Sequence, residues 1–204
     1  MNSIMNEEFL ELRKKTIERD FVRMNDQQRE AVYHIDGPLL ILAGAGSGKT
    51  TVLVNRIANM ITYGDAYQSN EIPAWVTDEE IQKVSSRLQE QKEIPAELKR
   101  KLGIHQVKPW NILAITFTNK AAGELKDRLE TVLGECARDI WASTFHSTCA
   151  RILRRFAEHI GYTNHFTIYD TDDTKRLLKD CQKALRIDDK VLSYRSILSE
   201  ISHA

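Results

Sequence analysis

The chain has 204 residues, 42% hydrophobic and 28% charged, a globular composition that excludes a wholly disordered protein. Its 29 Lys and Arg residues balance 29 Asp and Glu residues, so a globally basic nucleic-acid or membrane-surface binder is not indicated. The apolar runs hold about five residues, where a membrane span needs roughly 20, and the acidic N-terminus does not resemble a secretion signal. Three widely spaced cysteines favour free thiols in a cytoplasmic protein.

The first sixty residues predict a helix, a strand, a glycine-rich loop and a second helix. Residues 4–23 predict a charged helix with a weak apolar side. The continuous apolar run 39–42 predicts a strand buried on both faces. The glycine-rich segment 43–50 follows it directly. Apolar residues at helical spacing over 53–61 then predict a helix that ends at Gly64.

The stretch 65–108 differs in composition from the sequence around it. It contains two of the four prolines and a mixture of charges. Thr77 as the N-cap, with Glu80 three residues later, predicts a short helix from Thr77 to about Gln91. We interpret the stretch as an insertion on the surface of the core, without a function that the sequence reveals.

Strands and helices alternate again after this insertion. Apolar runs at 112–115 and 140–143 predict two further buried strands, each followed by a helix, and these helices end at Gly134 and Gly161. The order β-α-β-α-β-α predicts an α/β fold with a parallel sheet and flanking crossover helices. Further helical stretches follow to residue 204.

The glycine-rich segment matches a phosphate-binding loop, with an alanine at its first position. Its residues are Ala43, Gly44, Ala45, Gly46, Ser47, Gly48, Lys49 and Thr50. A buried strand before it and a helix after it are the context that this chemistry needs, because backbone N–H groups then converge at a helix N-terminus. Lys49 is expected to reach the terminal phosphates of a nucleotide, and the Thr50 hydroxyl to hold Mg²⁺.

Several classes of protein use such a loop, and the loop alone does not distinguish them. A GTPase is excluded, because 119–122 has alanine where a guanine-binding motif needs aspartate. A phosphotransferase acting on a small molecule remains open, with Arg151, Arg154 and Arg155 as a phosphate clamp. A non-catalytic nucleotide- or DNA-binding module is compatible with the loop as well, and so is a motor that moves along a polynucleotide.

Four motifs in register resemble the N-terminal part of the UvrD/PcrA/Rep helicases of superfamily 1. They lie at 25–32, 42–50, 116–122 and 144–146. The resemblance covers roughly residues 24–190 and is interrupted by the insertion 65–108, which is not part of the usual pattern. An alanine at position 43 is also usual in that family.

The resemblance implies a RecA-like P-loop fold with a parallel sheet, flanking helices and the start of an inserted helical subdomain. It divides the chain into an N-terminal helical extension (1–23), an ATP-binding core (24–160) and a truncated helical subdomain (161–204). The implied protein is an ATP-dependent 3′-to-5′ DNA helicase, of which this chain is an N-terminal fragment. ATP and Mg²⁺ are the implied cofactors, and single-stranded DNA or a duplex–single-strand junction the implied partner. No membrane contact is expected, and no protein partner can be named.

The same resemblance assigns roles to individual residues. Gln28 matches the glutamine that recognises the adenine edge, since an amide both donates and accepts. Two groups match motifs that contact single-stranded DNA: Thr116, Phe117, Thr118 and Asn119, and then Thr144, Phe145 and His146. Taken without the family, Phe117 at a strand end is more typical of a core residue than of a base-stacking one.

An acidic pair that holds Mg²⁺ and orients the attacking water is missing from the matching motifs. The candidate is Asp170 with Asp172 and Asp173, which we interpret as structural. We therefore expect that this chain alone does not hydrolyse ATP at a helicase-like rate.

Overall fold

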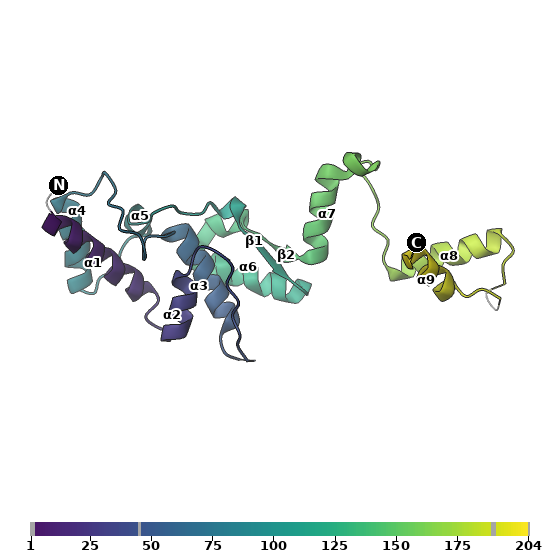
Figure 1. The fold of residues 1–204 in the computed structure, drawn as a ribbon, viewed down its shortest axis with the longest axis horizontal. Coiled ribbons are helices and arrows are strands. Elements are labelled where there is room, and N and C mark those ends of the chain that lie inside the picture. Colours follow the sequence, from purple (N-terminus) through teal and green to yellow (C-terminus); the bar gives the residue numbers. More distant parts are fainter. Residues whose placement is uncertain (1–2, 45, 189–190, 204) are drawn as a thin grey trace. The chain divides into compact units, whose positions relative to one another are not determined.

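The computed structural model describes residues 3–44, 46–188 and 191–203, which form two compact units, 1–149 and 150–204 (Figure 1). The helices of the first unit that lie before its sheet are α1 (Ser3–Asp20), α2 (Asp26–Tyr33), α3 (Lys49–Thr62), α4 (Asp78–Gln89), α5 (Ala96–Lys101) and the 3₁₀ turn η1 (Pro109–Asn111). The remaining elements are β1 (Leu113–Thr116), α6 (Asn119–Leu133), η2 (Gly134–Asp139), β2 (Trp141–Thr144), α7 (Phe145–Phe156), η3 (Ala157–Ile160), α8 (Thr171–Ala184) and α9 (Tyr194–His203).

The sheet consists of β1 and β2, paired in parallel with Leu113 opposite Trp141 and Thr116 opposite Thr144. Both strands begin and end one residue later than the sequence predicts. Helix α6 connects them and packs with α3 against the sheet, around a core in which Leu125 and Leu129 are buried. The predicted end of α6 is confirmed, because Gly134 caps it with a φ of 66°. The mixed α/β character and the parallel pairing are therefore confirmed.

The run 39–42 differs from its prediction. Among the described residues the sheet has two strands, and 39–42 lies outside it, without regular secondary structure. Leu40 is 80% exposed and Leu42 85% exposed, so the predicted strand buried on both faces is wrong for this structure. An apolar run expresses a preference for burial, but a parallel strand also needs a neighbour for its backbone N–H and C=O groups. No described strand supplies that neighbour.

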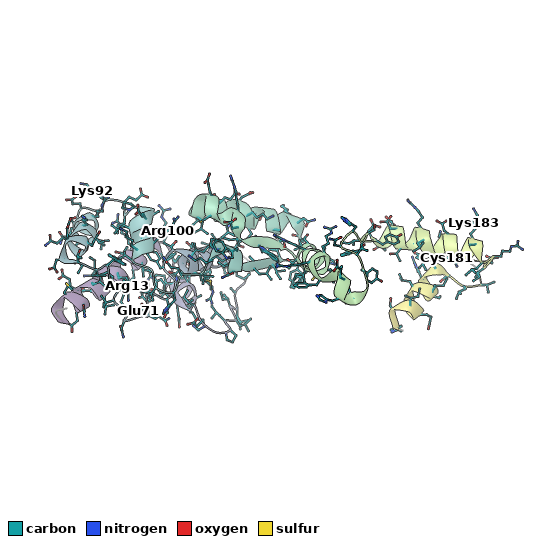
Figure 2. The ribbon with its side chains drawn as sticks, turned by 90° about the horizontal axis from the view of Figure 1, so that it is seen from above. Arg13, Glu71, Lys92, Arg100, Cys181 and Lys183 are labelled. Atoms are coloured by element: carbon teal, nitrogen blue, oxygen red, sulfur yellow. The ribbon has the colours of Figure 1, made fainter. Side chains whose placement is uncertain are left out.

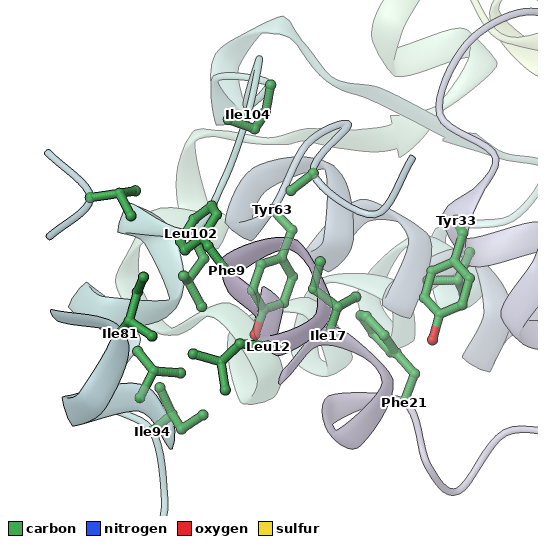
Figure 3. Close-up of a cluster of buried hydrophobic side chains, with 14 of the residues drawn as sticks. Phe9, Leu12, Ile17, Phe21, Tyr33, Tyr63, Ile81, Ile94, Leu102 and Ile104 are labelled. Atoms are coloured by element: carbon green, nitrogen blue, oxygen red, sulfur yellow. The ribbon is translucent and has the colours of Figure 1, made fainter. Parts of the chain in front are cut away.

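The N-terminal helix and the insertion build a second hydrophobic core together (Figure 3). Side chains of α1 and the turn after it meet side chains of the insertion in one buried cluster; those labelled in the figure include Phe9, Leu12, Ile17, Phe21, Ile81, Ile94, Leu102 and Ile104. The insertion is therefore more than a surface addition, which corrects the prediction. We call α1 together with residues 65–104 the N-terminal module.

A buried arginine joins the two parts of this module. Arg13 of α1 is fully buried, and its guanidinium donates to the carbonyl oxygens of Ser69 and Glu71, the latter at 2.9 Å (Figure 2). The same guanidinium lies 5.4 Å from the ring centroid of Phe9. Burial lowers the pKa of Arg13, so the carbonyl contacts replace the water that the charge has lost.

The insertion leaves and rejoins the core at one place. Backbone hydrogen bonds run from Asp65 N to Ile104 O (2.8 Å) and from Ile104 N to Tyr63 O (2.9 Å). Gly64 lies between them with a φ of 57°, and a Cβ atom there would stand 2.1 Å from the Ile104 carbonyl oxygen. We call this close approach of 63–65 to Ile104 the neck of the insertion. Only glycine fits at position 64, because its backbone is left-handed and a second stretch of backbone lies against it.

The second unit contains the paired helices α8 and α9. Gln182 of α8 is buried and donates to the Leu192 carbonyl oxygen. Asp170 and Asp173 form a capping box at the start of α8, in which each carboxylate accepts from the other residue's backbone N–H. These two carboxylates thus have a structural use. None of the described helices is long and apolar enough to cross a membrane.

Candidate functional site

The glycine-rich loop leads into the N-terminus of α3. Gly46 and Gly48 have φ values of 76° and 84°, a left-handed conformation that glycine adopts without strain. The Ser47 hydroxyl donates to the Gly44 carbonyl oxygen at 2.7 Å and steadies the turn. Gly48 is the N-cap of α3, and no described side chain caps this helix end. Its first N–H groups therefore stay available to an anion. Ala45 lies outside the described residues.

Lys49 and Thr50, the side chains expected to bind phosphate and Mg²⁺, are the first residues of α3, and both are exposed. The Lys49 ammonium lies back over the loop, where it donates to the carbonyl oxygens of Ala43 at 2.9 Å and Gly44 at 2.6 Å. Its positive charge is therefore held above the same turn whose N–H groups attract anions.

The loop residues, Lys49 and Thr50 fit a nucleoside triphosphate with Mg²⁺. A positive helix end, an ammonium and a hydroxyl meet at one loop, which is a donor set for phosphate oxygens. Among the described residues, no group of three or more His, Cys, Asp or Glu side chains gathers to hold a metal. At this loop the Thr50 hydroxyl and the phosphate oxygens would be ligands of Mg²⁺.

Gln28 lies beside the loop, at the start of α2. It forms a capping box with Asn25: its backbone N–H donates to Asn25 Oδ1 at 2.9 Å, and its Oε1 accepts from the Asn25 N–H at 3.1 Å. Its Nε2 donates to the Ser47 carbonyl oxygen at 3.2 Å. An amide oxygen accepts two hydrogen bonds and an amide nitrogen donates two. Gln28 therefore retains one donor and one acceptor next to the loop.

The other end of α2 is attached to α3 by two polar side chains that the sequence did not single out. Arg56 donates to the carbonyl oxygens of Ala31 at 2.8 Å and Ile35 at 3.4 Å. Asn59 is fully buried and donates to the Val32 carbonyl oxygen at 3.1 Å. Burial lowers the pKa of Arg56. The signal in the sequence is two polar residues, three apart, among the apolar positions Val52, Ile57 and Ile61 of the helix.

The two motifs matched to DNA contact meet at the carboxyl ends of the parallel strands. Phe117 follows β1 and Phe145 follows β2, and their ring centroids are 5.5 Å apart. Phe117 is 89% exposed and Phe145 is 47% exposed. The core alternative for Phe117 is therefore excluded, and the pair forms an exposed aromatic platform.

Polar residues of the same motifs adjoin these two phenylalanines in the sequence. The Thr118 hydroxyl accepts from the Ala121 N–H at 3.1 Å and caps α6, while the Thr116 hydroxyl donates to the Thr118 carbonyl oxygen. Asn119 and His146 are exposed at the first turns of α6 and α7. Thr144 differs, because it is buried and its hydroxyl accepts from the Ser147 N–H at 3.3 Å. Its hydroxyl thus orients the start of α7.

The arginines considered for a phosphate clamp contact rings of their own unit. Arg154 lies 5.9 Å from the ring centroid of Phe166, and Arg155 lies 5.9 Å from that of Phe156. With His165 and Asn164 they line a surface hollow of about 570 Å³. The side chains of the loop and of Gln28 belong to the first unit.

Comparison with known proteins gives a consistent result. The family described as "UvrD/REP helicase N-terminal domain" matches residues 24–93 and 92–204. The chain is 44% identical over 181 residues to the ATP-dependent DNA helicase PcrA of Bacillus subtilis, a match that covers 89% of this chain and 19% of that protein. Proteins of the same name from Staphylococcus epidermidis and Staphylococcus aureus are 43% and 41% identical over 180 residues. The chain spans about a fifth (19%) of the length of these curated relatives.

Proposed function

The chain belongs to the UvrD/REP helicase N-terminal domain family, and we propose from this that it is the nucleotide- and DNA-binding N-terminal part of an ATP-dependent DNA helicase. The observation that carries the proposal is that one compact unit holds both the uncapped loop–α3 junction and the exposed Phe117–Phe145 pair. A motor that moves along DNA needs a nucleotide site and a DNA site in the same unit, so that events at one can affect the other.

The nucleotide site comprises the loop, Lys49, Thr50 and Gln28. The loop N–H groups and Lys49 bind the phosphates of ATP, and Thr50 holds Mg²⁺. Mg²⁺ bound there would neutralise charge on the phosphate oxygens during transfer. Gln28 reads adenine, since its remaining donor and acceptor match the ring nitrogen and the exocyclic amine of that base.

The DNA site comprises Thr116, Phe117, Thr118, Asn119, Phe145 and His146, with Thr144 orienting the start of α7. Bases of a single strand stack on Phe117, and phosphates bind at the N-terminal turns of α6 and α7. Stacking on an exposed ring is tolerant of sequence, which suits a protein that moves along DNA.

The finer parts of the proposal rest on the family. They are a RecA-like ATP-binding core at 24–160, the start of a helical subdomain at 161–204, and 3′-to-5′ unwinding at duplex–single-strand junctions coupled to ATP hydrolysis. The location is cytoplasmic, a proposal that the three free cysteines support.

Calorimetric titration with ATP and Mg²⁺ tests the nucleotide site. We expect the 204-residue chain to bind ATP, and Lys49→Ala to abolish measurable binding because the main positive charge over the phosphates is removed. Lys83→Ala is the matched control, since Lys83 is an exposed lysine of α4 that pairs with Glu79 at 2.9 Å. Equal ATP affinity for the wild type and Lys49→Ala contradicts the proposal, and so does a loss of binding in Lys83→Ala as well.

A further inference from the structure

We propose that Arg56 is a positioning residue for base selection: it holds the far end of α2 against α3 and so places the Gln28 amide beside the phosphate loop. This inference rests on the proposed function of Gln28. Arg56 belongs to none of the motifs on which that function rests, and among the described residues its hydrogen bonds go to Ala31 and Ile35, not to the loop or to Gln28. Its effect is therefore indirect and passes through the helix.

The geometry begins with the short helix α2, which has eight residues. The last C=O groups of a helix lack partners within it. In α2, those of Ala31 and Val32 receive hydrogen bonds from Arg56 and Asn59, which belong to α3. The Arg56 guanidinium also places a positive charge at the negative end of the α2 dipole. The C-terminus of α2 is therefore fixed by α3.

The same helix α3 fixes the N-terminus of α2 by way of the loop. Gln28 Nε2 donates to Ser47 O at 3.2 Å, and Ser47 precedes the N-cap of α3. A Cβ atom at Gly48 would lie 3.0 Å from Gln28 Nε2, so the amide fits closely against the loop. Two attachments, one at each end, set the tilt of α2 relative to α3. Releasing the Arg56 attachment removes the two hydrogen bonds to Ala31 and Ile35 and leaves the C-terminus of α2 with the single bond that it accepts from Asn59 of α3. The tilt of α2 is then less firmly set, while Gln28 keeps its bond to Ser47 and its capping box.

The consequence is a loss of base selection rather than of phosphate binding. Adenine offers an acceptor and an amine donor on one edge, whereas guanine offers two acceptors there. If the Gln28 amide is displaced, it no longer forms both hydrogen bonds with adenine. It also no longer disfavours guanine by placing an acceptor against an acceptor. The loop N–H groups and Lys49 lie at the N-terminus of α3, about two helical turns before Arg56. We therefore expect them to keep their affinity for a triphosphate group.

The test compares affinities for Mg²⁺-ATP, Mg²⁺-GTP and tripolyphosphate, measured by calorimetry on the 204-residue chain. We expect the wild type to prefer ATP over GTP by about tenfold or more. Arg56→Met, which keeps the length but removes the donors, is expected to narrow this preference by about fivefold, with tripolyphosphate affinity within about twofold of the wild type. Arg87→Met is the matched control, because Arg87 also donates to a backbone carbonyl (Glu93 O, 2.9 Å) and lies in the insertion. Its preference should be unchanged.

A double-mutant cycle then decides whether Arg56 acts through Gln28. Gln28→Ala should remove most of the preference, and adding Arg56→Met to it should change the ratio no further. If Arg56→Met lowers the helical circular dichroism, Arg56→Gln replaces it, because the shorter amide cannot reach both carbonyl groups; the same narrowing is expected.

Three outcomes overturn the inference. Arg56→Met can weaken ATP, GTP and tripolyphosphate equally, which marks a general structural role. Arg56→Met can leave the ratio of ATP to GTP affinity unchanged. It can also lower that ratio by the same factor in the Gln28→Ala variant as in the wild type. Failure of the proposed function looks different, since the wild type then binds neither ATP nor tripolyphosphate. A wild type that binds ATP and GTP equally removes the role of Gln28 and this inference with it.

Discussion

Phe117 and Phe145 lie far apart in the sequence, and their ring centroids are 5.5 Å apart at an interplanar angle of 45°. The parallel register of β1 and β2 produces this contact, because Thr116 pairs with Thr144 and each phenylalanine follows its threonine. Two motifs that are separate in sequence thus share one surface at the carboxyl ends of the strands.

This pairing predicts the effect of Phe117→Ala on DNA binding. Removing the more exposed ring should weaken binding of a single-stranded oligonucleotide by roughly 1–3 kcal/mol, the usual value of one base–aromatic stack. Fluorescence anisotropy at fixed salt measures it. Trp110→Ala is the control, since Trp110 is 60% exposed but precedes β1 at the opposite end of the strand. A large fall in the free energy of unfolding, instead of in affinity, would show that Phe117 has a packing role.

The neck of the insertion predicts a strong position dependence of Gly→Ala substitutions. Gly64→Ala should lower the free energy of unfolding by at least about 2 kcal/mol, because the new Cβ meets the Ile104 carbonyl in a left-handed backbone. Gly123→Ala in α6 should instead raise it by up to about 1 kcal/mol, because the new Cβ meets no described atom within 4 Å beyond its own stretch of helix and alanine favours helix. Urea unfolding compares the two, and equal effects would mean that the neck is not under this constraint.

Because α1 and the insertion share one core, a substitution that destabilises α1 should destabilise the insertion as well. Arg13→Ala removes a buried guanidinium and leaves the carbonyl groups of Ser69 and Glu71 without their donor, which should cost roughly 3 kcal/mol. Amide hydrogen exchange in 66–102 should then accelerate along with that of α1. Lys14→Ala, one residue further and exposed, should leave exchange unchanged. Faster exchange in α1 alone would show that the two parts unfold independently.

Tyr33 predicts a loss of stability in alkali. Burial, together with nearby Tyr67 and Glu18, raises the pKa of Tyr33 to about 12, from 10.0. Between about pH 10 and pH 12 the unfolded chain loses this proton while the folded chain keeps it, so folding stability falls as pH rises, by up to roughly 2 kcal/mol. Below pH 10 this contribution is fully present.

Urea unfolding at several pH values measures that slope. Tyr33→Phe should flatten it, with little cost at pH 8, because the Tyr33 hydroxyl is buried without a hydrogen-bond partner among the described residues. Tyr162→Phe is the control, since Tyr162 is 63% exposed. An unchanged slope in Tyr33→Phe would assign the alkaline loss to other groups.

Phosphate release from ATP by the purified 204 residues should remain at background, with or without single-stranded DNA. The loop and Lys49 bind substrate and transition state alike, so they lower the dissociation constant more than the barrier. Acceleration needs acidic metal ligands and an arginine on the terminal phosphate, and that arginine alone is worth about 10³–10⁵ in rate. DNA-stimulated release that Lys49→Ala abolishes would contradict this, and Asp170→Ala would be the next variant to assay.

Local signals predicted the elements around the site well. The spacing of apolar residues and the stop at Gly134 define α6, and strands β1 and β2 lie within one residue of their predicted positions. The glycine pattern of the loop likewise matches its left-handed positions. These features depend on neighbouring residues, which is why periodicity and turn chemistry suffice to find them.

Features that depend on distant partners were not predictable in this way. The segment 39–42 is apolar, yet its state depends on a strand neighbour that no local pattern supplies. The joint core of α1 and the insertion depends on a match between two surfaces, of which Arg13 with Glu71 is one contact. Arg56 resembles any partly exposed helical arginine until the carbonyl groups of α2 are seen beside it.

The closed neck at Gly64 and Ile104 also bears on how this chain tolerates change in length. The backbone hydrogen bonds at Asp65 and Ile104 hold the two ends of the insertion together. The path from α3 into β1 therefore does not depend on how many residues the insertion contains. Loop-closure entropy rises only slowly with length, by about 0.6 kcal/mol per doubling. We therefore expect that added residues beside the exposed side chain of Lys92 leave the path from α3 into β1 unchanged.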